Sequence, residues 1–172
     1  ILQEVLAVTR RFEHDGIKIP VIAAGGIFDG KDIARVIRLG ASGVQMATRF
    51  VCTHECDASM EYKQAYISAK EEDIVIIQSP VGMPGRVISN DFVKKITRGE
   101  RVNFNCEYKC LFTCDFKKVN YCIAKALLNA YHGKLDEGFV MCGSNAYRIK
   151  KIVSVKELID ELSAEAAIYL NK

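Results

Sequence analysis

The stretch IPVIAAGGIFDGKDIARVIRLGASGVQMATRF, residues 19–50, decides the fold. Its first six residues form a short, mostly apolar run, which is typical of a parallel strand covered on both faces. A helix is expected next, because Asp29 is a suitable N-cap, Ile33, Val36 and Ile37 recur at helical spacing, and Gly40 stands where a glycine ends helices. Residues 43–46 then read as a second strand. A crossover of this length makes the two strands parallel neighbours with a right-handed connection.

Two turns of small residues follow these strands. Gly25 and Gly26 end the first strand, and Ala47 and Thr48 end the second. Ligands bind at the carboxyl ends of parallel strands in both barrels and open sheets. Turns without bulky side chains allow backbone N–H groups to point at one anion. The pattern therefore predicts a phosphate shared by two neighbouring loops, although ordinary tight turns would give the same residues.

The same residues resemble a known family. AAGGIFDG (residues 23–30) and LGASGVQMATRF (39–50) are similar to the last two βα units of the nitronate monooxygenase family, also called 2-nitropropane dioxygenases. The similarity continues through THEC (53–56), SPVGMPGR (79–86), YCIAKAL (121–127) and CGSNAYRI (142–149). These enzymes are FMN-dependent TIM barrels related to the flavin-type enoyl-acyl-carrier-protein reductases.

The resemblance implies an α/β fold and an FMN site. The residues expected to bind the cofactor are Ala24, Gly25, Gly26, Gln45, Ala47 and Thr48, with Gln45 near the flavin. The chain departs from the family at Ala47, where a glycine is usual. Since the expected contact is a main-chain N–H, alanine suits this position only if its φ is negative. The family's catalytic histidine lies upstream of this segment, so we assign no catalytic residue to this chain and expect the segment to be inactive alone.

The length of 172 residues falls short of a complete barrel, which needs roughly 200 residues or more. We therefore expect the carboxyl-terminal portion of one. Residues 1–73 would hold helix six, strands seven and eight, and helices seven and eight, the last over 58–70 with Asp57 as N-cap. Residues 74–172 would form a small, mainly helical extension, in which residues 79–86 are a fixed loop because they contain two prolines and two glycines. Asn90 and the Ser154–Glu157 pair predict the starts of two further helices.

The amino-acid composition limits the classes of molecule that the chain is expected to bind. A net charge of +3 with scattered basic residues gives no footprint for nucleic acid or a membrane surface, and no apolar stretch approaches a membrane span. The seven cysteines are odd in number and irregularly spaced, which favours reduced thiols and a cytoplasmic location. The oligomeric state stays open, a homo-oligomer included.

A cysteine cluster is the remaining candidate for chemistry. Cys106, Cys110, Cys114 and Cys122 are spaced C-x3-C-x3-C-x7-C, which lacks the C-x2-C pairs of common zinc and iron–sulfur sites. Cysteine is also one of the residue types found most often in protein cores. We therefore expect no metal and interpret the cluster as core. His54, near the second turn, is the only histidine close to the expected site.

The expected function is FMN-dependent oxidation of alkyl nitronates by O₂, with this segment anchoring the FMN phosphate. A flavin-type enoyl-acyl-carrier-protein reductase using NAD(P)H shares the same loops and is the nearest alternative. An inosine-monophosphate-dehydrogenase-like barrel would use them for a nucleotide substrate. A non-catalytic phosphate-binding remnant, or an electron-transfer module on the cysteines, belongs to a different class.

Overall fold

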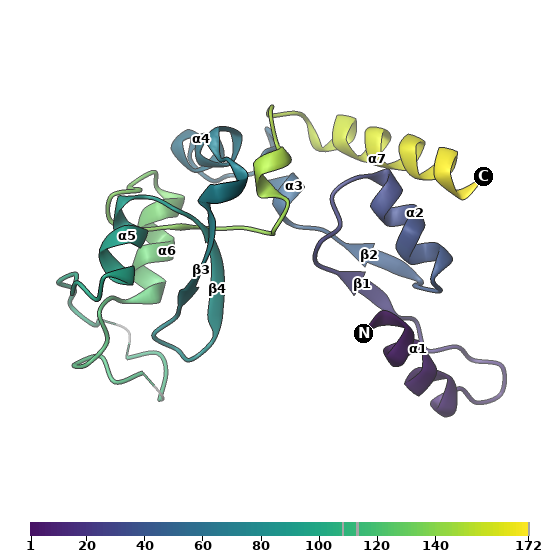
Figure 1. Cartoon of the computed structure of the whole chain (residues 1–172), viewed down its shortest axis with the longest axis horizontal. Coiled ribbons are helices and arrows are strands. Elements are labelled where there is room, and N and C mark those ends of the chain that lie inside the picture. Colours follow the sequence, from purple (N-terminus) through teal and green to yellow (C-terminus); the bar gives the residue numbers. More distant parts are fainter. Residues whose placement is uncertain (108, 113, 172) are drawn as a thin grey trace. The chain divides into compact units, whose positions relative to one another are not determined.

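The computed structural model describes residues 1–107, 109–112 and 114–171 (Figure 1). Contacts divide them into two compact units. The first contains residues 1–55 and 153–172, and the second contains residues 56–152. This grouping differs from a division at residue 74, because the last helix belongs with the first unit and residues 56–73 belong with the second.

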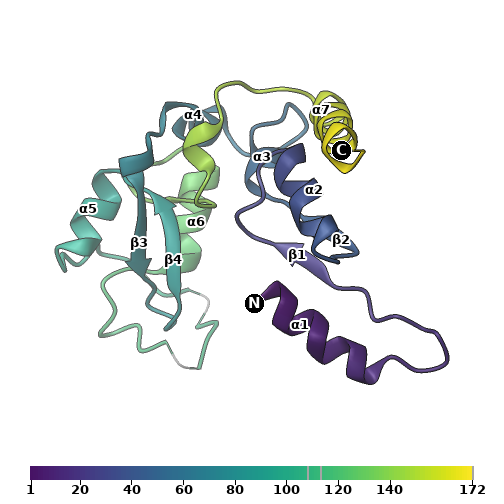
Figure 2. The ribbon, with the colours of Figure 1, turned by 45° about the vertical axis from the view of Figure 1, so that its right-hand side comes forward.

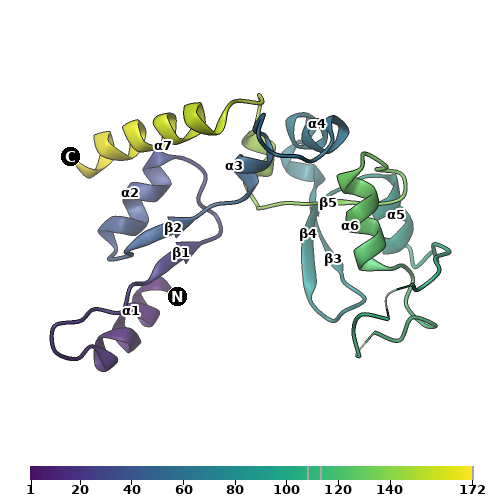
Figure 3. The same cartoon turned by 180° about the vertical axis from the view of Figure 1, so that it is seen from behind.

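The first unit is a small α/β structure (Figure 3). Strands β1 and β2 pair in parallel, with Ala24 opposite Gln45, as the strand–helix–strand pattern predicts. The elements of this unit are α1 (Leu2–Thr9), the 3₁₀ turn η1 (Arg10–Phe12), β1 (Ile22–Ala24), α2 (Gly30–Arg38), β2 (Gly43–Gln45), α3 (Thr48–Val51) and α7 (Val155–Leu170).

Strand β1 is shorter and more exposed than the apolar run predicts. It spans three residues, and the side chain of Ile22 is 54% exposed. The expectation of a strand covered on both faces is therefore wrong for this chain. The reason is that, within the described residues, the parallel sheet consists of β1 and β2 alone, so few neighbours cover it.

Helix α7 supplies most of the cover on α2, and the two lie side by side in Figure 1. Leu158, Leu162 and Ala166 of α7 are buried, as are Ala34 and Val36 of α2. The approach is closest at Gly30, where an added Cβ would lie 2.4 Å from the backbone nitrogen of Ala166. The two helices can pack this tightly only because residue 30 has no side chain.

The residues that the sequence predicts at the helix ends of this unit are confirmed in the structure. The Asp29 side chain accepts a hydrogen bond from the Asp32 amide, and Gly40 has φ +106° just beyond α2. Ser154 and Glu157 form the predicted capping box of α7. The N-termini of α2 and α7 thus satisfy orphan backbone amides within the chain.

The second unit contains an antiparallel sheet of β3, β4 and β5; Figure 2 labels β3 and β4, and Figure 3 also labels β5. Its elements are α4 (Met60–Ser68), the 3₁₀ turn η2 (Glu71–Asp73), β3 (Ile74–Gln78), β4 (Pro84–Ile88), α5 (Asp91–Thr97), α6 (Ile123–Tyr131), β5 (Val140–Met141) and the 3₁₀ turn η3 (Ala146–Arg148). In the described ranges, no helix of either unit is long and apolar enough to cross a membrane.

Two sequence-based expectations for this unit need correction. The loop assigned to residues 79–86 ends early, since Pro84 already pairs with Gln78 as the first residue of β4, a position where proline is tolerated. The sheet was not part of the expected helical extension. Ser59, not Asp57, caps α4 by accepting from the Tyr62 amide. The predicted cap at Asn90 is confirmed, because its side chain accepts from Val93.

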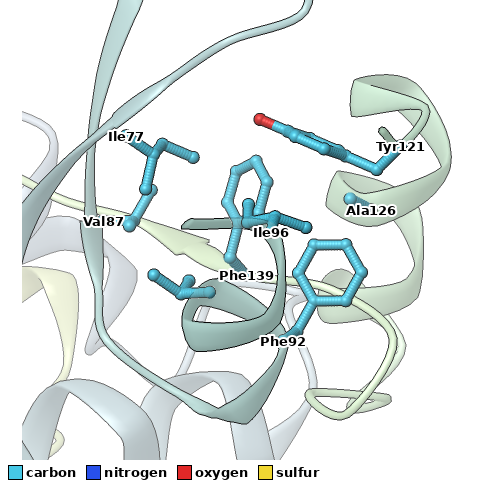
Figure 4. Packing of buried hydrophobic residues seen from close by; sticks show 8 residues of the cluster. Ile77, Val87, Phe92, Ile96, Tyr121, Ala126 and Phe139 are labelled. Atoms are coloured by element: carbon cyan, nitrogen blue, oxygen red, sulfur yellow. The ribbon is translucent and has the colours of Figure 1, made fainter. Parts of the chain in front are cut away.

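An aromatic cluster forms the core of the second unit (Figure 4). The rings of Phe92, Tyr121 and Phe139 have centroids 5.8–6.0 Å apart, and two of the three contacts are edge-to-face. Ile77 of β3 and Val87 of β4 pack against the same cluster. Burial raises the pKa of Tyr121 to about 12, and its hydroxyl donates to the carbonyl of Gln78 at 3.3 Å.

Candidate phosphate-binding site

The two predicted turns leave the same edge of the parallel sheet. Ala24 and Gln45 are paired in register, so the chain continues from neighbouring positions into Gly25–Gly26 and into Met46–Ala47. Ala24, Gly25, Gly26, Gln45 and Ala47 are all exposed, and Thr48 is half-buried. The strand pairing therefore brings the six expected binding residues to one end of the first unit.

The first turn has room for a ligand beside its backbone. Gly25 has φ +85° and Gly26 has φ +71°, a region that residues with side chains adopt only with strain. A Cβ placed on either glycine would find nothing within 4 Å. Packing within the chain thus does not explain the glycines, whereas their positive φ does.

The backbone of the second turn has the negative φ that an alanine at residue 47 requires. Ala47 has φ −121°, so its methyl group adds no strain, and its carbonyl accepts from the amides of Phe50 and Val51 at 2.9 and 3.3 Å. Thr48 begins the short helix α3. Replacement of the family's usual glycine by alanine is compatible with an anion at the backbone here.

Arg49 joins the two turns, a role that sequence reasoning missed. Its Nη1 donates to the Phe28 carbonyl at 3.0 Å, and its Nη2 pairs with a carboxylate oxygen of Glu161 at 2.8 Å. The guanidinium carbon also lies 4.6 Å from the centre of the Phe28 ring. Since the side chain is only 12% exposed, Arg49 fixes the segment after Gly26 to the second turn and to α7 rather than binding a ligand.

A carboxylate of α7 and one of α2 support the same region. Glu165 accepts from the amide of Gly30 at 2.8 Å, and Asp32 accepts from the amide of Phe28 at 3.0 Å. These bonds hold the backbone between the first turn and α2 from two sides. The only sequence signal for this network is the arginine in ATRF, and its carboxylate partner Glu161 lies 112 residues away.

An apolar hollow adjoins the second turn. Its volume is about 450 Å³, and Gln45 contributes an amide to a lining that otherwise includes Met46, Phe50 and the α7 residues Ile159 and Leu162. Apolar hollows with a few polar groups are typical of small-molecule sites. His54 is exposed in the segment after α3, and its amide donates to the Val153 carbonyl at 2.9 Å.

The cysteines do not form the expected core. Cys106, Cys114 and Cys122 are half-buried, Cys110 is exposed, and the residues around them form neither helix nor strand over the described part of 101–121. The interpretation as buried core is therefore wrong. Periodicity at every fourth position misled because the loop is irregular and its cysteines share no helix face.

Comparison with known proteins identifies the family. Residues 3–165 match the sequence profile of the nitronate monooxygenases. The chain belongs to the nitronate monooxygenase family. This is a family of flavin-dependent oxidoreductases, and the match extends over both compact units.

Individual relatives cover the chain in part. It is 46% identical over 82 residues to a probable nitronate monooxygenase of Staphylococcus saprophyticus and 43% identical over 86 residues to one of Staphylococcus aureus strain Newman. The matched stretches are 48% and 50% of this chain but only 23% and 24% of those proteins. The chain thus spans about a quarter of the curated relatives it matches.

Solved structures cover nearly all of the chain. FabK from Thermotoga maritima superposes with a TM-score of 0.75 at 30% identity, over 99% of this chain and 49% of that one. A nitroalkane oxidase from Streptomyces ansochromogenes gives a TM-score of 0.69 at 23% identity, over 99% and 44%, which shows a shared fold. Both neighbours contain about as much chain again outside the matched part.

Proposed function

We propose that this chain is part of an FMN-dependent oxidoreductase that oxidises alkyl nitronates with O₂, and that its first unit anchors the FMN phosphate. The observation that carries the proposal is the parallel register of β1 and β2, which ends in two small-residue turns at the same sheet edge. The proposed reaction class rests on family membership. The proposed role of this segment, phosphate binding, rests on the two turns.

The phosphate would be held by the backbone rather than by a lysine. Amides of Gly25, Gly26, Ala47 and Thr48 are the proposed donors, with Ala24 completing the first loop. A Cβ on either glycine would meet nothing within 4 Å, so space is open beside their backbone, and the negative φ of Ala47 is compatible with close approach. Gln45, which lines the apolar hollow, would orient the flavin ring.

When bound, FMN supplies the redox chemistry, and the protein contributes position and electrostatics. The residues of this chain bind and orient; we place no catalytic acid or base among them. We further propose that the first unit corresponds to the seventh and eighth βα units of a TIM barrel. Solved relatives that match 99% of this chain over about half their own length support that placement.

A comparison of FMN with riboflavin tests the phosphate site, because the two differ only in the phosphate. We expect the chain to bind FMN more tightly in a flavin fluorescence titration. We also expect FMN to shift the backbone amide NMR signals of Gly25, Gly26, Ala47 and Thr48. Equal binding of the two flavins, or shifts confined to other residues, would contradict the proposed site.

A matched pair of glycine variants separates binding from strain. Gly25→Ala and Gly82→Ala both place a methyl group at positive φ, +85° and +89°, and both find nothing within 4 Å. Each should therefore cost about 1–2 kcal/mol of stability. Only Gly25→Ala should also reduce the preference for FMN over riboflavin.

The enoyl-acyl-carrier-protein reductase alternative is favoured by the 30% identity to FabK. It predicts NAD(P)H oxidation with a crotonyl thioester, whereas nitronate oxidation predicts oxygen uptake with an alkyl nitronate. A protein that binds FMN but supports neither reaction would be the phosphate-binding remnant. The odd number and irregular spacing of the seven cysteines support a reducing compartment, for which we propose the cytoplasm.

A further inference from the structure

Four cysteines of the second unit line one cavity. Cys106, Cys110, Cys114 and Cys122 surround a space of about 140 Å³, and all four are free thiols. They come from a single segment, residues 106–122, that has neither helix nor strand where the structure describes it. Long irregular segments of this kind in a compact unit are usually functional.

The rest of the cavity wall is largely apolar. Its apolar lining includes Phe104, Leu111 and Phe116, and Lys109 is the single charged residue in the lining. Lys109 has φ +42°, an uncommon conformation for a residue with a side chain. Such conformations concentrate at ligand sites, where surrounding structure compensates for the strain.

The thiols lie close enough to interact electrostatically. Partial burial raises the pKa of Cys114, and the neighbouring thiols of Cys106, Cys110 and Cys122 raise it further. Four sulfur ligands facing one apolar space match the donor set of iron–sulfur clusters, which Cys₄ sites hold. Thiolates also favour soft metals over Mg²⁺ or Ca²⁺.

A cluster and a single ion require different arrangements of the thiols. Zinc requires every sulfur to lie about 2.3 Å from one point. Among the described residues, no three His, Cys, Asp or Glu side chains are arranged to hold one metal ion. In a cubane cluster each thiolate binds a different iron, so the sulfurs lie further apart around a larger object.

We propose that Cys106, Cys110, Cys114 and Cys122 ligate an iron–sulfur cluster in the second unit. The spacing C-x3-C-x3-C-x7-C hides this site from sequence motifs built on C-x2-C pairs. An irregular loop can turn all four side chains inward, whereas a helix would present them along its length. Lys109 supplies positive charge beside a cluster that carries net negative charge with its thiolates. The site is independent of the FMN loops.

Iron and sulfide analysis of the whole chain tests the proposal. The protein is purified without oxygen, or reconstituted with ferrous iron, sulfide and a thiol reductant, and then desalted. We expect tightly bound iron and acid-labile sulfide in equal amounts, with a broad visible absorbance that dithionite bleaches. Both chemical assays are blind to flavin, so loss of FMN binding would not disturb the result.

Serine variants identify the ligands. Cys114→Ser and Cys122→Ser should each lose most of the iron and sulfide, whereas Cys142→Ser and Cys56→Ser, which lie outside the cavity, should retain both. Circular dichroism of each apoprotein checks that the fold is kept. If a variant fails to fold, mass spectrometry of the native wild-type holoprotein, with and without a chelator, still reports the bound mass.

Three outcomes would overturn the proposal. One is a single zinc ion without sulfide, which would make the site mononuclear. Another is iron without sulfide that the cavity variants retain, which would be adventitious iron only. The third is a protein that binds neither iron nor sulfide after reconstitution.

Discussion

Replacement of Arg49 by alanine should loosen the first unit selectively. The change removes a charged hydrogen bond to the Phe28 carbonyl, worth about 1.5–3 kcal/mol, and a cation–π contact of about 0.5–2 kcal/mol with its ring. The ion pair with the half-exposed Glu161 adds only about 0.2–1 kcal/mol. These contacts share one side chain and do not add fully, so we expect a loss of about 3 kcal/mol.

Arg35→Ala is the matched control. Arg35 lies on α2 in the same unit, is 58% exposed, and pairs with Asp32 at 3.6 Å. Its removal should cost less than about 0.5 kcal/mol. Arg49→Lys should recover only part of the loss, because one ammonium group cannot reach both partners in the plane of a guanidinium fork.

Urea unfolding combined with hydrogen exchange measures the effect by unit. In the Arg49→Ala variant, peptides covering residues 22–38 should exchange faster, whereas peptides of α5 and α6 should keep their protection. The binding of FMN should weaken as well, since Arg49 positions the segment after Gly26. Equal stability of the Arg49→Ala and Arg35→Ala variants would refute the reasoning, as would an equal loss of protection in both units.

Further predictions concern packing and pH. Gly30→Ala should destabilise the first unit by about 1–3 kcal/mol or more in urea unfolding, because the new Cβ would lie 2.4 Å from the Ala166 nitrogen; an unchanged midpoint would show that α7 does not pack as described. Phe139→Ala, at 1% exposure, should cost about 3–5 kcal/mol and melt the second unit first. Burial raises the pKa of Tyr121 to about 12 from 10.0, so the unfolded chain loses this proton at lower pH than the native chain. Stability measured by urea unfolding should therefore fall from pH 10 towards 12, and Tyr121→Phe should flatten that decline.

Local signals were readable from the sequence. Asp29, Asn90 and Ser154 cap the helices that they were expected to cap, because a capping bond joins residues three apart and needs no knowledge of the fold. Gly40, which has positive φ, ends α2 as expected for the same reason. The parallel pairing of β1 and β2 also followed, since a strand–helix–strand pattern of this length permits few other arrangements.

Contacts between residues far apart in the sequence could not be predicted from the sequence. Glu165 accepts from Gly30 across 135 positions, and no periodicity in either segment specifies the partner of the other. The hairpin of β3 and β4 was hidden because Pro84 and Gly85 are strand breakers in most settings. The prediction that the cysteines form part of the core failed for a third reason. Their spacing fits a helix, but the segment around them is irregular.

The second unit leaves and rejoins the first at adjoining points of the backbone. Thr53 and Val153 form an isolated parallel bridge, and the Val153 amide donates to the Cys52 carbonyl at 3.3 Å. Residues 56–152 are therefore an insertion in the sequence of the first unit, and the segments on either side of the insertion are joined by backbone hydrogen bonds. Because these flanking segments are already held together, a change within the insertion, its cysteine-rich loop included, does not require a change in the backbone of the first unit.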